Sequence, residues 1–533
     1  MDIAADWSEE EYNTNLGYST FATFANTRQR LPGGSDGNWS LSYRRGDLSD
    51  LTDYIQSRSG DPEYQDGSAR LNLALGEHNR VDLGAVYSED DVTFEDDEET
   101  ASSQIDTWYL WARLDREFSD ALRGSFSASW VDFQREKRQR SFEEEDKGGF
   151  LDHDQDIQRL ALRNDFSHLR GGVLQEFGWQ LEYNDGDYRH VSRIDRGEVA
   201  DIIGTEREVD RDISLQPDGW SGGAYWAGEW ELGDGWLLQP GLRWDFQDYY
   251  LATGADHQFS PRLGLAYAFD EELLVRLSIG RFHQPEGIQE LQVIDGITEF
   301  YEPQRSDQVI AGVEWQHADW DFTGEAYYKR YEDSKGRWEN MFNPFVLLPE
   351  MEPDRVELLP DKARAWGVDL DLSYEFTDEL SGMLRYSYME AEDRIEGEWI
   401  PRRWSQEHTV NAGLSWQRDN LFLSAAVVWH SGWWSTELPP FVPEGQVIPV
   451  EDVLNNTELR EFLSVDVSAR YGWEFGNTYL QVYADISNIT DRKNQAGIDY
   501  DIDEEEAPGG LVITPDQETL LGRVSSVGIT LSF

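Results

Sequence analysis

The chain has no cysteine, and its basic residues are far outnumbered by acidic ones. Its 533 residues include 5 Met and 0 Cys, and 45 Lys and Arg stand against 105 Asp and Glu, for a formal net charge of −60. The absence of Cys excludes a disulfide scaffold, thiolate metal sites and thiol catalysis. The shortage of basic side chains argues against nucleic acid as a partner, because binding to phosphates requires a basic face.

The chain also lacks a long apolar run. A membrane-spanning helix needs about 20 consecutive apolar residues, and the longest charge-free stretch that we find, residues 421–436, contains Ser, His and Gly. The amino terminus, MDIAAD, has neither the basic region nor the apolar core of a signal peptide. These features predict either a cytosolic protein or a chain whose export signal is not in this sequence.

Aromatic residues are abundant, with 24 Phe, 24 Tyr and 22 Trp. Low hydropathy with high charge usually indicates disorder, but this many rings can bury a large apolar surface. Strict alternation of apolar and polar residues is the dominant pattern, for example in VDLDLSYE at 368–375, LSVDVSARY at 463–471 and SVGITLSF at 526–533. A period of two predicts strands with one apolar and one polar face.

The connections between the alternating runs are of two kinds. Very short polar turns, such as those at 270–272, 318–319, 377–379, 418–420 and 476–477, predict tight hairpins. The other ends are joined by long acidic segments with Gly and Pro, at about 195–216, 284–303, 334–361, 433–459 and 495–521. Short turns at one end and long loops at the other are typical of an outer-membrane barrel.

The runs predict a transmembrane antiparallel β-barrel of about 22 strands. Strands are expected to begin near 11, 21, 37, 66, 80, 105, 121, 156, 176, 219, 236, 258, 273, 304, 320, 362, 380, 405, 421, 460, 478 and 522. A membrane strand needs only about 9–11 residues, so many strands should project beyond the bilayer. An even count places both chain ends on one side.

A soluble sandwich or propeller is the alternative all-β interpretation. A sandwich also alternates, whereas a propeller should repeat about every 40 residues, and we find no such repeat. The aromatics favour a membrane, because Trp and Tyr gather at both bilayer interfaces of such barrels. Two neighbouring strands carry many of them: Trp220, Tyr225, Trp226, Trp230, Trp236, Trp244, Tyr249 and Tyr250.

Several short motifs occur in a particular order along the chain: NLGYSTF at 15–21 with RLPGG at 30–34, FSPRLGLAY at 259–267, LSIGRF at 277–282, PQRSDQ at 303–308, ARAWGVD at 363–369 and DISNITDR at 485–492. With GITLSF at 528–533, this series resembles the barrel of the TonB-dependent receptors, active transporters of Gram-negative outer membranes. The resemblance implies that Gly528, Ile529, Leu531 and Phe533 belong to the signal read by the barrel assembly machinery.

The family implies a plug domain of some 120–150 residues ahead of the first strand, which fills the lumen and engages the energy-coupling TonB complex. Here residues 1–10 are a short acidic segment and 11–533 are expected to form the barrel. We therefore expect no plug in this chain, and a TonB partner only through a plug that this chain does not contain. A barrel of this size without a plug would hold a wide aqueous lumen.

No pattern predicts catalysis, a cofactor or a metal site. The acidic runs at 89–91, 95–99, 143–146 and 501–506 match no calcium-loop spacing and are expected to be solvated faces, with a cation site as the open alternative because Ca²⁺ prefers oxygen ligands. The His residues show no metal-ligand spacing. His430 and Ser431 are neighbours on one strand and should face opposite ways, so they should not form a catalytic pair.

Substrate recognition is expected in the long loops. Five loop aromatics are candidate substrate contacts: Phe300, Tyr301, Trp338, Phe342 and Phe345. Aromatics in loops can grip a ligand or pack the loops together. Charged residues on the polar strand faces should line the lumen: Asp321, Glu325, Lys329, Asp369, Asp371 and Arg470.

By resemblance, the chain is expected to take up a scarce nutrient across the outer membrane, such as a ferric siderophore, cobalamin or an oligosaccharide. The expected partners are outer-membrane lipid, the assembly machinery and a small-molecule substrate. A passive pore or truncated barrel and a soluble all-β binding protein remain alternatives.

Overall fold

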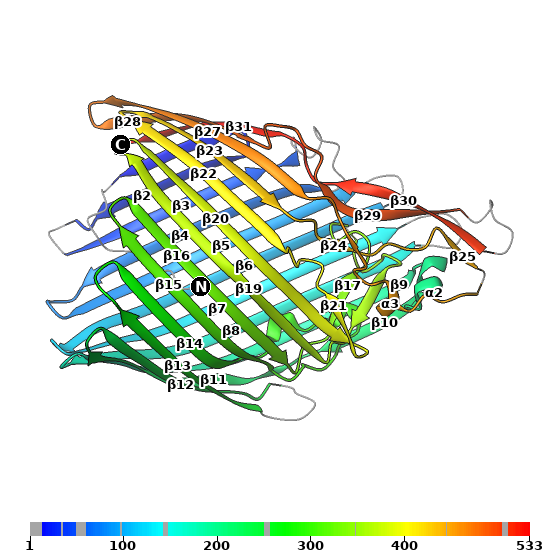
Figure 1. The fold of residues 1–533 in the computed structure, drawn as a ribbon, viewed down its shortest axis with the longest axis horizontal. Helices are drawn as coiled ribbons and strands as arrows, with labels where there is room; N and C mark the ends of the chain where they lie inside the picture. The colour runs from blue at the N-terminus through cyan, green and yellow to red at the C-terminus, as the bar shows by residue number, and fades with distance from the viewer. Residues whose placement is uncertain are drawn as a thin grey trace.

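The computed structural model describes residues 13–32, 36–49, 60–95, 99–141, 148–249, 256–346, 348–443, 445–503 and 510–533. Within these ranges the chain is mostly strand, and 22 antiparallel strands close into one barrel (Figure 1). The predicted segment 1–10 lies outside the described residues. No helix in the described part of the chain has the length and apolar character to cross a membrane.

The barrel strands pair in chain order. In the first half they are β1 (Thr14–Ser19), β2 (Ala22–Arg30), β3 (Gly37–Asp47), β4 (Asp61–Ala74), β5 (Asn79–Glu95), β6 (Glu99–Ser119), β7 (Leu122–Ser141), β8 (Gly148–Arg170), β9 (Val173–Asp195), β11 (Asp218–Gly233) and β12 (Trp236–Gln247). In the second half they are β13 (Asp256–Ala268), β14 (Leu273–Gln284), β15 (Gln304–His317), β16 (Trp320–Glu332), β19 (Lys362–Thr377), β20 (Leu380–Ile395), β22 (His408–Arg418), β23 (Leu421–His430), β27 (Phe462–Phe475), β28 (Thr478–Ser487) and β31 (Val524–Ser532).

The last strand closes the ring on the first. In β31, Ile529 lies opposite Tyr18 of β1 on one side and Val482 of β28 on the other. Beyond the strand, the Phe533 backbone exchanges two hydrogen bonds with Thr14, of 2.8 and 3.0 Å. Every barrel strand therefore has two neighbours, which leaves the barrel without an open edge and contradicts the sandwich and propeller alternatives.

The two ends of the barrel differ as the sequence predicts. Two-residue turns such as Asp234-Gly235 and Ala318-Asp319 join strands at one end, on the left of Figure 1. Asp234, Ala318 and Asp419 adopt φ near +50°, the left-handed geometry that tight hairpin turns require. The other end carries long loops with their own small elements: α2 (Glu198–Ile203), β10 (Glu208–Leu215), η1 (Ile288–Glu290), η2 (Val293–Asp295), β17 (Arg337–Asn340), β18 (Arg355–Leu358), β21 (Glu398–Pro401), β24 (Trp434–Ser435), β25 (Phe441–Pro443), α3 (Val450–Val453), β26 (Thr457–Glu458), β29 (Gln495–Asp503) and β30 (Gly510–Thr519).

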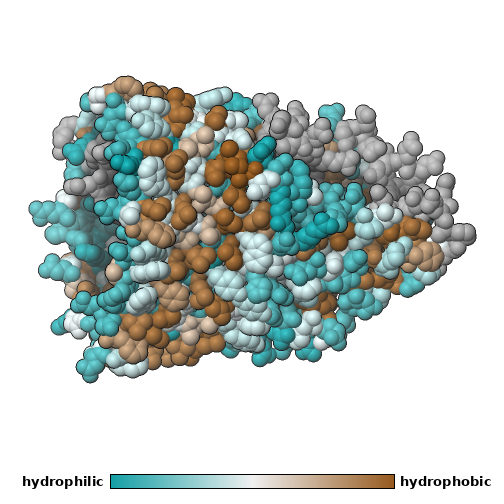
Figure 2. Space-filling model, turned by 45° about the horizontal axis from the view of Figure 1, so that its top comes forward, coloured by the Kyte–Doolittle hydropathy of each residue, from teal (hydrophilic) through white to brown (hydrophobic). Residues whose placement is uncertain are grey.

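An apolar band crosses the visible outer face of the barrel, next to a hydrophilic end (Figure 2). On β14, the outward residues Val275, Leu277 and Ile279 are all exposed large hydrophobic side chains. Their strand neighbours Arg276 and Ser278 are on the opposite face, because side chains alternate along a strand. An apolar exterior is the surface that lipid requires.

Aromatic rings mark both edges of this band. Three strands each carry an outward aromatic pair eight residues apart: Trp236 and Trp244 on β12, Trp320 and Tyr328 on β16, and Trp366 and Tyr374 on β19. At about 3.3 Å per residue, eight residues cover about 26 Å of strand. A strand tilt of about 40° reduces this span to about 20 Å along the membrane normal, close to the height of an outer-membrane apolar belt.

Two of the aromatics predicted at the interfaces lie elsewhere, and a third, Tyr250, lies outside the described residues. Tyr225 is on the lumen face of β11 and donates a hydrogen bond of 2.7 Å to Asp165. Tyr249 is buried beneath the loop 285–303 and donates a hydrogen bond of 2.7 Å to the Glu286 carbonyl. Strand parity explains the first case, because neighbouring Trp226 takes the outward position.

Candidate functional site

The lumen wall is polar, and many of its charges are paired. Arg113 and Asp115, Arg163 and Asp165, and Arg243 and Asp245 each form an ion pair of 2.6–2.8 Å between alternate residues of one strand. Because both members of each pair share one strand face, they line the lumen together. A solvated wall of this kind suits a water-filled passage.

The lumen charges expected from the sequence share the inner face of neighbouring strands. Glu325 of β16 lies directly opposite Asp369 of β19, and Asp371 lies opposite Thr323. Asp371 forms an ion pair with Arg385 of β20, and Glu325 forms one with Arg276 of β14. This part of the wall is therefore a network of ions across several strands, with an acidic excess.

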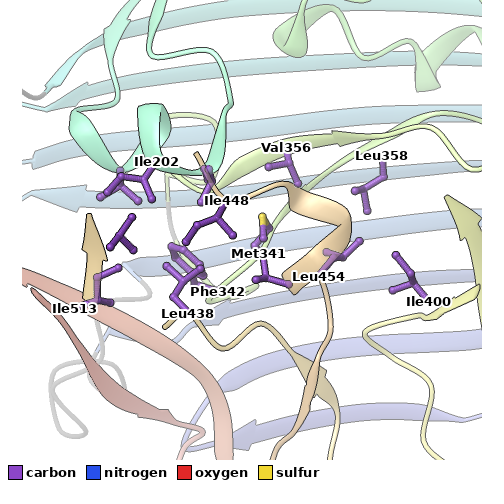
Figure 3. Packing of buried hydrophobic residues seen from close by; sticks show 14 residues of the cluster. Ile202, Met341, Phe342, Val356, Leu358, Ile400, Leu438, Ile448, Leu454 and Ile513 are labelled. Atoms are coloured by element: carbon purple, nitrogen blue, oxygen red, sulfur yellow. The ribbon is translucent and has the colours of Figure 1, made fainter. Parts of the chain in front are cut away.

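The long loops pack together over one end of the lumen and form a common apolar core, which we call the cap core (Figure 3). Its buried members come from five connections far apart in sequence: Val199, Ile202, Ile203, Met341, Phe342, Val356, Leu358, Ile400, Leu438, Val442, Ile448, Val453, Leu454 and Ile513. A core of this size makes the loops one cooperative unit.

A second apolar cluster joins the loop 285–303 to the inner wall. Ile288, Val293 and Phe300 of this loop pack against Ile157 of β8 and Tyr188 of β9. The Tyr188 hydroxyl donates a hydrogen bond to the Ile288 carbonyl, and the loop is thereby fixed to the wall.

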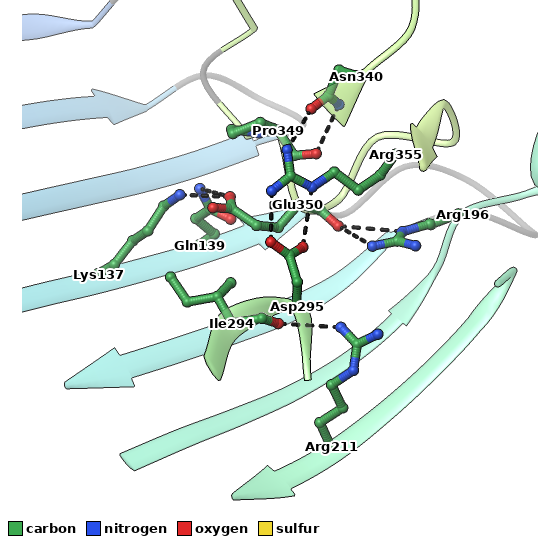
Figure 4. Close-up of polar contacts among 10 residues, drawn as sticks. All are labelled: Lys137, Gln139, Arg196, Arg211, Ile294, Asp295, Asn340, Pro349, Glu350 and Arg355. Carbon is green, nitrogen blue, oxygen red and sulfur yellow. Dashed lines mark hydrogen bonds and ion pairs between the residues drawn. The ribbon is translucent and has the colours of Figure 1, made fainter. Parts of the chain in front are cut away.

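A buried polar network holds the segment 333–361, which connects β16 to β19 and which we call the strap (Figure 4). The Glu350 carboxylate accepts a hydrogen bond of 2.5 Å from the Lys137 ammonium of β7. The Glu350 carbonyl accepts a hydrogen bond of 2.8 Å from Arg196, just after β9. Arg355 of the strap pairs with Asp295 of the loop 285–303 at 2.7 Å. The strap is thus bound both to the wall and to a neighbouring loop.

Burial shifts the pKa values of these charged loop groups. Although burial opposes it, the Lys137 ammonium holds the pKa of Glu350 below its usual range. Burial lowers the pKa of Arg196 to about 10. Burial raises the pKa of Asp354, which accepts a hydrogen bond of 2.6 Å from the Phe342 amide. Glu350 is therefore the buried loop carboxylate whose ionised form the network stabilises.

The predicted loop aromatics occupy two environments. Phe300 and Phe342 are 4% and 5% exposed, and they pack against Tyr249 and Tyr500 inside the loops. Tyr301 and Trp338 are partly buried. Phe345 is 50% exposed and available for contact with a solute.

Phe345 lies in an aromatic row that the sequence analysis did not find. Its ring centroid is 5.9 Å from that of Trp404 and 6.1 Å from that of Trp433. Trp433 in turn contacts His430, whose ring stacks on Phe462 of β27 at 4.7 Å. Trp404 is 48% exposed, so it and Phe345 present adjoining ring surfaces. Trp433 and Trp434 are adjacent in the sequence, but Phe345 and Trp404, whose rings contact Trp433, come from other loops.

The described residues contain no group of three or more His, Asp or Glu side chains placed to hold a metal ion. His430 donates a hydrogen bond of 2.6 Å from Nδ1–H to the Ser431 carbonyl, a contact with the backbone rather than the hydroxyl. The acidic run 143–146 and residues 504–506 lie outside the described part of the chain.

A closed barrel with an apolar outer band, a polar lumen and loops gathered over one end defines an outer-membrane-type β-barrel. The chain belongs to the TonB-dependent receptor-like β-barrel family, whose model matches residues 6–489. No curated protein sequence matches the chain.

Solved structures of receptors and transporters share the fold. The pyoverdine-bound FpvA of P. aeruginosa is 11% identical, with a TM-score of 0.69 over 98% of this chain and 71% of FpvA. The ferric yersiniabactin uptake receptor FyuA of Yersinia pestis is 13% identical, with a TM-score of 0.68 over 98% of this chain and 79% of FyuA. The copper transporter OprC is 13% identical, with a TM-score of 0.70 over 98% of this chain and 80% of OprC.

Proposed function

We propose that this chain is the barrel of an outer-membrane receptor of a Gram-negative bacterium and takes up a scarce nutrient. The observation that carries the proposal is a family-typical closed barrel whose external loops form one packed cap over a polar lumen. The nutrient class follows from the relatives, among which FpvA and FyuA are described with ferric siderophores. Cobalamin and oligosaccharides remain further candidates.

The partners of the proposed receptor are outer-membrane lipid, the barrel assembly machinery and a small-molecule substrate. Coupling to a TonB complex, through a plug, is part of the proposal because the family is defined by that partner. The exposed rings of Phe345 and Trp404 are the proposed first contact for the substrate, since half-exposed aromatics bind ring-bearing or apolar ligand surfaces at little conformational cost.

The test is uptake by cells that carry or lack this chain, with a ferric siderophore, cobalamin and an oligosaccharide as separate radiolabelled probes. The proposal expects saturable uptake of one probe class that an uncoupler of the proton gradient abolishes. Uptake that rises linearly with concentration and ignores the uncoupler would establish a passive pore instead.

Variants refine the same experiment. A double substitution, Phe345→Ala with Trp404→Ala, should raise the half-saturating concentration by about 30-fold if each ring contributes around 1 kcal/mol. Leu359→Ala is the matched control, because Leu359 is a similarly exposed apolar side chain of the strap that lies outside the aromatic row.

A further inference from the structure

The strap reaches from its own strands to a distant part of the barrel wall. It leaves the barrel at the end of β16 and returns at the start of β19. Between these points, Glu350 contacts Lys137 of β7 and Arg196 after β9, on either side of β8. Strands β8 and β16 are seven steps apart in the ring of 22. The strap therefore reaches across the mouth of the barrel.

The contact at Glu350 differs from an ordinary surface ion pair. The side chains of Glu350 and Lys137 are 9% and 8% exposed, and they meet at 2.5 Å. Removal of one partner of a buried ion pair is strongly destabilising, because it leaves the other partner as an uncompensated buried charge. The closed position of the strap is therefore sensitive to the loss of either charge.

Four other long connections share an apolar core with the strap. Met341, Phe342, Val356 and Leu358 of the strap supply part of the cap core, which also contains residues from four other connections (Figure 3). Arg355 of the strap pairs with Asp295 of the loop 285–303 (Figure 4). Displacement of the strap would therefore open the cap as a whole.

We propose that the strap is a gate that holds the external mouth closed and that the ion pair between Glu350 and Lys137 is its latch. In the open position both groups reach water, where each is solvated without a partner. The gate concerns passage through the lumen and does not depend on which nutrient the receptor takes up.

The experiment measures ionic current through the purified 533-residue chain in planar lipid bilayers. The wild-type chain should show low conductance with rare openings. Glu350→Ala should raise the mean conductance at least tenfold, because loss of a buried partner shifts a two-state equilibrium by at least that factor. Glu357→Ala is the matched control: Glu357 is an exposed carboxylate of the same strap and should leave the current unchanged.

A rescue experiment separates latching from simple loss of structure. The chain has no Cys, so a Lys137→Cys, Glu350→Cys double variant carries two unique thiols. It should conduct freely until a short reducible thiol cross-linker joins the two positions, and conduct again after reduction. Each protein is first checked for heat-modifiable gel mobility, the signature of a folded barrel.

Three results would overturn the proposal. A large constant current through the wild-type chain would show that the strap does not close the mouth. Low current in folded Glu350→Ala would show that the pair is not the latch. A cross-linked double variant that conducts like the reduced one would show that the distance between these positions does not control passage. None of these three results decides the outcome of the uptake assays, so the proposed transport function is tested separately from the gate.

Discussion

Two adjacent leucines of the strap offer a sharp test of the cap core. Leu358 is 1% exposed and belongs to the cap core, whereas Leu359 is 58% exposed. Truncation of a buried leucine to alanine costs about 2–5 kcal/mol, the sum of lost transfer energy and the cavity left behind. Truncation of an exposed leucine usually changes stability by less than about 0.5 kcal/mol. The same chemical change at neighbouring positions should therefore have very different effects.

The assay is native-state amide hydrogen exchange, followed by mass spectrometry on the intact chain in detergent. In Leu358→Ala, amides of the strap and of the connection 431–461 should exchange about 30-fold to several-thousand-fold faster, since each 1.4 kcal/mol is a factor of ten. Amides of barrel strands such as β14 should be unaffected. Leu359→Ala should match the wild-type protein throughout.

Two outcomes would refute this reasoning. Equal acceleration in both variants would show that burial in the cap core does not determine loop stability. Acceleration in Leu358→Ala that extends equally to the barrel strands would show that cap and barrel unfold as one unit.

The remaining predictions concern the latch, the lipid face and the closure of the ring. Because Lys137 lowers the pKa of Glu350, the ionised carboxylate stabilises the cap at pH values above the usual carboxyl range, and this contribution is lost as the pH falls through the lowered pKa. Amide exchange rates in the loops of wild type and Glu350→Gln should therefore converge at acid pH. A difference in rate that does not change with pH would contradict a stabilising role for the ionised carboxylate. Leu277→Arg places a charge on the lipid face of β14 and should lower the free energy of unfolding by about 2–4 kcal/mol near the bilayer midplane, whereas Ser278→Arg on the lumen face should be tolerated. Urea titration of the barrel in lipid vesicles would measure both effects. Phe533→Ala should reduce the fraction of folded barrel made in cells, because Phe533 is an outward aromatic at the strand pair that closes the ring. Heat-modifiable gel mobility measures this fraction, and Ser532→Ala should assemble normally.

The barrel itself was predictable because lipid and lumen impose opposite demands on alternate residues. The expected strand starts at 236, 273, 304, 320 and 362 coincide with those of β12, β14, β15, β16 and β19. The pattern fails where a strand rises beyond the bilayer. Strand β8 begins at Gly148, eight residues before the expected start. The pattern misses this part of the strand because outward Asp152 and Asp154 alternate there with inward His153 and Gln155. With polar residues on both faces, hydropathy no longer marks the strand.

The cap was not predictable from local pattern. The sequence predicts the long loops and several of their aromatics. Whether a loop ring is buried, as Phe300 is, or exposed, as Phe345 is, depends on which other loops contact it. Glu350 and Lys137 are 213 residues apart in the chain. Nothing in the sequence around Glu350 distinguishes it from the many other acidic residues, so its buried ion pair could not be predicted. Contacts between loops far apart in sequence are set by the three-dimensional arrangement that the barrel imposes.

The most direct test of the whole account is a single-cysteine scan of β14 in membranes, which the lack of native Cys makes possible. Positions 275–280 are replaced one at a time and exposed to a charged maleimide that does not enter lipid. We predict labelling at 276, 278 and 280, which face the lumen, and protection at 275, 277 and 279, which face lipid. Uniform labelling, or protection without a period of two, would contradict a barrel with lipid outside and water inside.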